Sequence, residues 1–149
     1  MGVCTSQSSE QKVVGDPVKR SLIALKTLPR FLPRIKEGIV IDVYDGDTIT
    51  VAAELAGEWF RFSVRVRGVD TPEIRTRNLQ EKAAAYRARQ FVVVQCLHKK
   101  VSLVDHVKEK YGRCCARVIL PCGSDLAKLL VEKKLGVEYN GGTKKSFEA

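Results

Sequence analysis

Hydrophobic and polar residues alternate along three consecutive stretches of the chain, a period typical of β-strands with one buried face. The first stretch follows Gly38, and its apolar side chains are expected to share one face. They are Ile39, Ile41 and Val43. A turn leads to a return strand over residues 48–53, and a second turn surrounds Gly57. In the third stretch Arg65 falls on the face opposite the apolar residues, which are Phe60, Phe62, Val64 and Val66.

The second half of the chain predicts two helices and two more strands. Asn78 is expected to cap a helix over residues 79–97, with Glu81 completing a capping box. One mostly apolar stripe runs along this helix, formed by Ala84, Ala88, Phe91, Val92 and Gln95. Strands are predicted over 100–105 and 114–120. A last helix over 125–135 is expected to end at Gly136 as its C-cap.

Three strands, a helix, two strands and a helix predict a mainly β, α+β fold. The order matches a five-stranded Greek-key barrel of the oligonucleotide-binding type, with two helices and a short N-terminal helix. Residues 38–140 are expected to form this domain, and residues 141–149 a polar tail.

Residues 1–37 are predicted to be a flexible basic segment. Asp16 and Pro17 favour the start of a short helix that ends near Pro29. Seven basic and three acidic residues give the segment a net charge of +4. Each base adds about 1 kcal/mol of attraction near an anionic membrane.

The first six residues fit the N-myristoylation pattern, with Gly2 as the acceptor and Cys4 as a candidate palmitoylation site. One acyl chain alone binds a membrane only marginally, so the bases or a second acyl chain would have to contribute. An untethered tail is the alternative. The protein is expected on the cytoplasmic side of a membrane if acylated, and otherwise in the cytoplasm.

The composition adds a candidate partner. Lys and Arg outnumber Asp and Glu by 26 to 17 in 149 residues, a net charge of +9. This suits nucleic acid or an anionic membrane face, although a basic surface with no single partner is the alternative. The five cysteines, without a signal-peptide pattern, favour reduced thiols. Cys96 and either Cys114 or Cys115 are expected in the core.

Three short motifs carry the candidate chemistry. They are Asp45-Gly46-Asp47-Thr48, Arg65 to Glu73, and Lys110-Tyr111-Gly112-Arg113. The first two supply carboxylates from Asp47, Asp70 and Glu73 beside Arg65. Clustered carboxylates suit a hard divalent cation, and an arginine fork suits a phosphate.

Together, in this order and spacing, the motifs resemble the staphylococcal-nuclease-like (thermonuclease) family. The family's D-G-D-T turn, R-x-x-G-[IV]-D-x-P-E strand end and later Y-G-R all have counterparts here. Each motif alone is weak, since D-G-D-T is a good hairpin turn in any β protein. The resemblance covers roughly residues 39–139 and implies the same barrel.

The resemblance also implies a metal site and a base. Asp47 and Asp70 would bind Ca²⁺, with the Thr71 backbone carbonyl as a further ligand. Glu73 would be the general base that activates water. The competing interpretations are a turn cap for Asp47 and a first-turn helix acid for Glu73.

The same resemblance assigns the substrate contacts. Arg65 and Arg113 would grip the phosphate and stabilise the pentavalent state. Lys110 and Tyr111 would touch a terminal phosphate, and Tyr139 would stack on a base. Tyr111 as a core residue, and Tyr139 as a residue packed on the barrel, are the alternatives.

The implied activity is that of a monomeric, calcium-dependent, sugar-nonspecific nuclease. It would cleave DNA and RNA, single strands preferentially, to 3′-phosphate and 5′-hydroxyl ends. Two rival hypotheses are a catalytically inactive nucleic-acid-binding barrel and a membrane-tethered adaptor. Inactive copies usually lack an acid or an arginine, and every such position is filled here.

Overall fold

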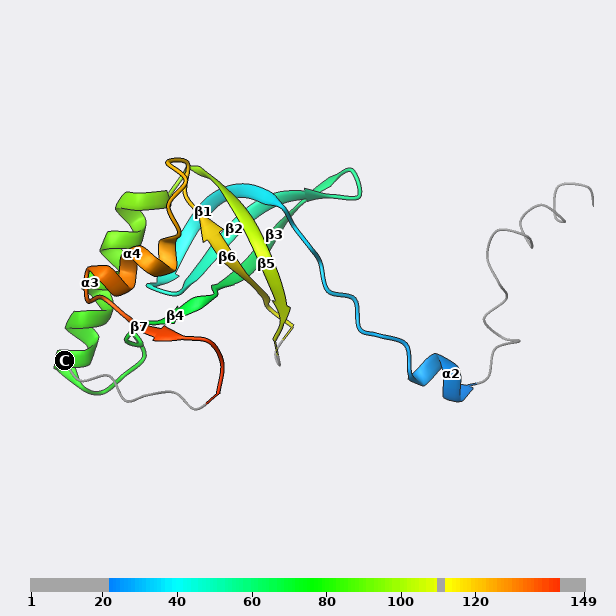
Figure 1. Cartoon of the computed structure of the whole chain (residues 1–149), viewed down its shortest axis with the longest axis horizontal. Coiled ribbons are helices and arrows are strands. Elements are labelled where there is room, and N and C mark those ends of the chain that lie inside the picture. The colour runs from blue at the N-terminus through cyan, green and yellow to red at the C-terminus, as the bar shows by residue number, and fades with distance from the viewer. Residues whose placement is uncertain (1–21, 110–111, 143–149) are drawn as a thin grey trace, which may run out of the picture. The chain divides into compact units, whose positions relative to one another are not determined.

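The computed structural model describes residues 22–109 and 112–142. The chain divides into two compact units, Met1–Phe31 and Leu32–Ala149. In the first unit the structure describes one short helix, α2 (Leu22–Lys26) (Figure 1). The predicted helix start at Asp16 and Pro17 lies outside the described residues, as do Gly2 and Cys4.

The second unit is built on a closed five-stranded barrel (Figure 1). Its strands are β1 (Glu37–Asp45), β2 (Thr48–Leu55), β3 (Glu58–Val66), β5 (Lys100–Lys108) and β6 (Cys114–Ile119). They follow the order β1-β2-β3-β6-β5 around the barrel. Neighbours are antiparallel except β3 and β6, which are parallel. The predicted α+β barrel of the oligonucleotide-binding type is confirmed.

The prediction that the apolar residues Ile39, Ile41 and Val43 share one face of β1 is wrong. Ile39 and Ile41 are exposed, whereas Val40 and Val43 are completely buried. The pairing of β1 with β2 shifts register between Val40 and Asp42. Such a bulge inserts one residue and breaks the strict alternation of faces, so the three apolar side chains cannot share one face.

The helix α3 (Leu79–Cys96) is confirmed together with its cap. The Asn78 side chain accepts hydrogen bonds from the backbone N–H groups of Gln80 (2.9 Å) and Glu81 (3.2 Å). The capping box is wrong in detail, because the Glu81 carboxylate accepts instead from the Thr76 hydroxyl at 2.7 Å. That hydroxyl accepts from the Asn78 N–H at 3.2 Å, so Thr76 links the two groups.

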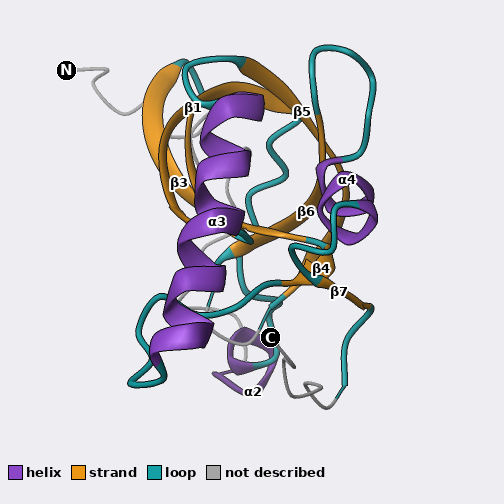
Figure 2. Cartoon of the chain, turned by 90° about the vertical axis from the view of Figure 1, so that its left-hand side faces the viewer, coloured by secondary structure: helices purple, strands orange, loops and turns teal. Residues whose placement is uncertain are grey.

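Both longer helices lie on the same side of the barrel (Figure 1), and α3 crosses in front of β1 in Figure 2. The buried face of α3 consists of Ala84, Ala85, Ala88, Val92 and Cys96. A Cβ atom on Gly46 would lie 2.9 Å from Cβ of Ala88 and 2.8 Å from the hydroxyl of Thr71. Only glycine therefore lets α3 and Thr71 approach the β1–β2 turn this closely.

The helix α4 (Leu126–Glu132) is shorter than predicted. Asp125 caps its start by accepting from the Ala127 N–H at 2.9 Å. The helix ends at Glu132, and the chain reverses at Lys134, whose φ is 56°. Gly136 is therefore not the C-cap. Gly136 instead packs against Val69, the residue before the predicted metal ligand Asp70, and an added Cβ would lie 2.7 Å from Cγ2 of Val69.

A second, two-stranded sheet is not predicted by the sequence pattern. It pairs β4 (Gly68–Asp70) with β7 (Val137–Tyr139) in antiparallel register, with Gly68 opposite Tyr139. Three-residue strands carry too little alternation to be read from sequence. The pairing brings Tyr139 close to the chain between Arg65 and Asp70.

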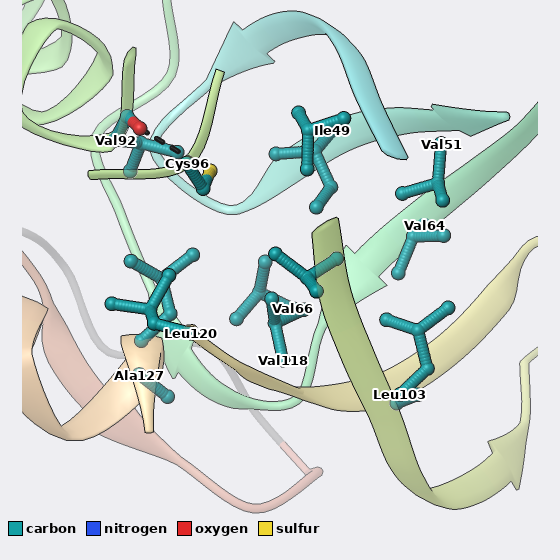
Figure 3. Close-up of a cluster of buried hydrophobic side chains, with 14 of the residues drawn as sticks. Ile49, Val51, Val64, Val66, Val92, Cys96, Leu103, Val118, Leu120 and Ala127 are labelled. Carbon is teal, nitrogen blue, oxygen red and sulfur yellow. Dashed lines mark hydrogen bonds between the residues drawn. The ribbon is translucent and has the colours of Figure 1, made fainter. Parts of the chain in front are cut away.

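The core fills the barrel and extends beneath both helices (Figure 3). It is rich in valine, as suits strands buried on one face. Cys96 and Cys114 are both buried, as predicted. Burial raises the pKa of Cys96 to about 11. None of the helices described here is long and apolar enough to cross a lipid bilayer.

Candidate active site

The turn between β1 and β2 supplies the first carboxylates. Asp45 closes the turn by accepting from the Asp47 N–H at 3.1 Å, a hydrogen bond typical of an aspartate in a turn. Asp47 is only 6% exposed, and its two oxygens face different partners. One accepts from the Thr48 hydroxyl at 3.2 Å, and the other accepts from the Thr71 N–H at 2.9 Å. Asp47 thus ties the turn to the end of β4.

Arg65 joins the first two motifs in space. Thr48 pairs with Arg65 in the β2–β3 register, so the guanidinium lies beside the turn. Its Nη1 lies 2.9 Å from Asp47 Oδ2, and its Nη2 lies 3.1 Å from Asp70 Oδ1. Nη1 also donates to the carbonyl of Val69 at 3.1 Å. Arg65 is 8% exposed, and these contacts compensate for the burial of its charge.

The local charges do not balance. Asp45, Asp47 and Asp70 are all buried carboxylates, and Arg65 is the buried cation among the described residues. Burial, and then the negative charge of Asp47, raise the pKa of Asp45 to about 6. This rise in the pKa is the expected response of a carboxyl group that is buried beside a second carboxylate.

A cavity of about 260 Å³ brings the predicted residues together. It is lined by Tyr44, Asp45, Asp47, Thr48, Arg65, Glu73, Ile74, Arg75 and Arg113. The metal-ligand candidate Asp47, the base candidate Glu73 and both predicted phosphate-binding arginines therefore share one pocket. Asp70 and Thr71 adjoin it through their contacts with Arg65 and Asp47.

Arg113 reaches this cavity from the loop before β6, and Glu109 holds its guanidinium. Nε donates to Oε2 of Glu109 at 2.9 Å, and Nη2 donates to Oε1 at 2.8 Å. The pair is bidentate and half-buried. Sequence reasoning passed over Glu109. The signal in the sequence that could have identified this pair is an acidic residue four positions before Arg113.

A larger cavity of about 640 Å³ shares both arginines with the first. Its other basic side chains are Arg67 and Lys108, and its walls include Tyr139 and Asn140. The Tyr139 hydroxyl donates to the carbonyl of Gly142 at 3.0 Å. The structure thus brings Tyr139 to the same region as Arg65 and Arg113. Lys110 and Tyr111 lie outside the described residues, and their roles stay predictions.

The donor chemistry of the site suits a hard cation. Across residues 22–109 and 112–142, no three histidine, cysteine or carboxylate side chains are grouped so as to hold a metal. Asp47 and Asp70 are instead bridged by Arg65. The groups that could bind a cation are nevertheless oxygens, and the buried Thr71 hydroxyl has no hydrogen-bond partner among the described residues. Oxygen donors with surplus negative charge fit Ca²⁺.

The chain is similar in sequence to a known protein family and to an archaeal protein. The sequence profile described as "Staphylococcal nuclease homologue" matches residues 63–148, more than half of the chain. An uncharacterized protein of Methanocaldococcus jannaschii is 33% identical over 109 residues, which cover 60% of this chain and 51% of that protein. The chain therefore spans about half the length of this relative.

Proposed function

Because this chain belongs to the family of staphylococcal nuclease homologues, we propose that it is a calcium-dependent nuclease that hydrolyses phosphodiester bonds in DNA and RNA. One observation carries the proposal. Asp47, Arg65, Glu73 and Arg113 come from separate parts of the sequence and line a single cavity. Phosphodiester hydrolysis needs both kinds of group in one pocket, because a carboxylate can activate water and a guanidinium can neutralise the charge of the phosphate.

Each residue then has a distinct task. Glu73 lies exposed at the cavity wall and accepts the proton of the attacking water. The guanidiniums of Arg65 and Arg113 stabilise the negative charge that gathers on the equatorial phosphate oxygens. Arg113 also assists the departure of the 5′-oxygen. The products carry 3′-phosphate and 5′-hydroxyl ends.

Calcium would be held by the carboxylates of Asp47 and Asp70 and by the Thr71 carbonyl. When bound, the ion supplies positive charge that polarises the phosphate and offsets the repulsion between the acids. The substrate contacts proposed here are phosphate contacts and stacking, and neither depends on the sugar. Stacking on Tyr139 requires an unpaired base, which favours single strands. Lys110 and Tyr111 are proposed to bind a terminal phosphate.

A binding barrel without activity is the alternative. The acids argue against it, because buried carboxylates beside a phosphate-binding pocket repel a polyanion and weaken simple binding. Asp45, Asp47 and Asp70 are all buried in this position. The acids therefore make sense where a cation and chemistry are involved.

Cleavage assays test the proposal directly. We expect the full chain to degrade single-stranded DNA and RNA in calcium, to cut duplex plasmid more slowly, and to stop in chelator. The products should accept phosphate at their 5′ ends, and phosphatase should remove their 3′ phosphate. Glu73→Gln protein purified in parallel controls for contaminating nucleases. Absence of cleavage on every substrate would rule out the enzyme, and full activity in chelator would rule out the metal.

We further propose that residues 1–37 tether the nuclease domain, residues 38–140, to the cytoplasmic face of a membrane. The support is the acylation pattern at Gly2 and Cys4 and the net charge of +4 in this segment. Expressed with a fluorescent tag at its C-terminus, the protein should lie at membranes, and Gly2→Ala should release it. A wild-type protein that is already released would contradict the tether.

A further inference from the structure

Tyr44 and Arg75 lie at the proposed active site and have no part in the mechanism above. Tyr44 is the residue before the β1–β2 turn, and it is 44% exposed. Both residues line the cavity that holds Glu73, Arg65 and Arg113. The Arg75 guanidinium carbon lies over the Tyr44 ring, 5.9 Å from its centroid.

This contact is loose. Cation–π pairs extend to about 6 Å, so the Tyr44–Arg75 distance is at the outer limit. Both side chains face solvent, where such a contact contributes little to stability. The ring and the guanidinium are both flat π surfaces on which a nucleobase stacks.

The two cavities of the site have a simple relation to each other. The residues that line both of them are Arg65 and Arg113. Among the described residues, each cavity also has one tyrosine, Tyr44 in the smaller and Tyr139 in the larger. A phosphodiester has a nucleoside on each side. If the shared arginines hold the phosphate, the two nucleosides extend into different cavities.

We infer that Tyr44 and Arg75 form a second base-stacking subsite, across the scissile phosphate from Tyr139. The inference rests on the proposed nuclease function, because it places the phosphate at Arg65 and Arg113. The ligand is an unpaired nucleobase of any identity, since every base has a π face. The enzyme then binds a dinucleotide unit with one base in each cavity. The stacked bases of a duplex fit neither cavity.

Dinucleotide binding separates this subsite from catalysis. The ligands are a deoxydinucleotide with one phosphodiester and two analogues, each lacking one of its two bases. Affinities are measured by calorimetry in calcium, in a Glu73→Gln background that prevents turnover. Tyr44→Leu keeps apolar bulk and removes the π face. We expect it to weaken binding of the complete dinucleotide about tenfold.

The analogues decide which contact was lost. Tyr44→Leu should leave the affinity of one analogue unchanged and weaken the other, and Tyr139→Leu should show the reverse pattern. Tyr44→Phe should bind like the parent. Tyr86→Leu, at a half-exposed tyrosine on α3, is the matched control and should have no effect. Equal weakening of both analogues by Tyr44→Leu, or no weakening, would overturn the subsite.

Failure of the subsite and failure of the nuclease are distinguishable. The expected binding pattern, with a wild-type protein that cleaves nothing, would overturn the nuclease and keep the subsite. Cleavage by wild type, with identical dinucleotide affinity in Tyr44→Leu and its parent, would overturn the subsite alone.

Discussion

Glu109 engages the guanidinium of Arg113 through two hydrogen bonds of 2.9 and 2.8 Å. The Arg113 fork, which is proposed to grip the phosphate, thus already has a carboxylate partner within the protein. Glu109 occupies the edge of the guanidinium formed by Nε and Nη2, so a phosphate that binds this edge bidentately must compete with Glu109 for the same N–H groups. Glu109 is therefore placed to weaken substrate binding.

Glu109→Gln tests this competition. The variant removes the competing charge and keeps the size of the side chain, so we expect KM for single-stranded DNA to fall by up to about fivefold, the worth of a partly exposed ion pair. The rate kcat should stay near the wild-type value, and Glu109→Asp, which keeps the charge, should resemble wild type. A rise in KM would show instead that Glu109 positions Arg113 for binding.

Glu73→Gln tests the general base. Glu73 is exposed, so the change should leave the unfolding free energy within about 0.5 kcal/mol of wild type. Loss of the proton acceptor should lower kcat by about 10²- to 10⁴-fold with little change in KM. Steady-state cleavage of a labelled oligonucleotide measures both parameters. Glu58→Gln, at an exposed acid on β3, is the matched control. Unchanged kcat in Glu73→Gln would exclude this residue as the base.

Local sequence signals predicted much of the fold. The cap at Asn78, the helix after it and the order of strands and helices along the chain follow from periodicity and capping chemistry over short ranges. The bulge in β1 does not, because alternation assumes one residue per pleat, and Ile39 and Ile41 were placed on that assumption. Pairing of β4 with β7 joins residues about seventy positions apart, and neither strand is long enough to show a period.

The site was predicted as a set of residues but not as a network. The motifs indicate which acids and arginines belong together. They do not show that Arg65 is buried between Asp47 and Asp70, since an arginine on the polar face of a strand is normally solvated. Tyr44 and Glu109 lie next to motif residues, and only the folded arrangement shows that Tyr44 lines the cavity and that Glu109 pairs with Arg113.

Arg65→Gln tests the charge balance in that network. The change leaves the buried carboxylates of Asp47 and Asp70 without their guanidinium, which should lower the unfolding free energy by about 3–5 kcal/mol in chelator. Urea titration measures the loss. Calcium should restore part of it, because the cation would supply the missing positive charge. Arg61→Gln, at an exposed position of β3, should be neutral. A calcium-independent loss would argue against a cation at these acids.

Gly136→Ala links the small sheet to the chemistry. An added Cβ would lie 2.7 Å from Cγ2 of Val69 and 2.9 Å from the carbonyl oxygen of Asp70, so β4 must move. The shift would displace Asp70 from Arg65, and we expect kcat/KM to fall at least tenfold in calcium, together with about 1–3 kcal/mol of stability. Gly57→Ala is the control, because its φ of 82° strains the β2–β3 turn while an added Cβ there meets no atom within 4 Å. That variant should lose stability without losing activity. If Gly136→Ala lost stability alone, the position of Asp70 would not depend on β4 packing, and the β4–β7 sheet would serve the fold rather than the active site.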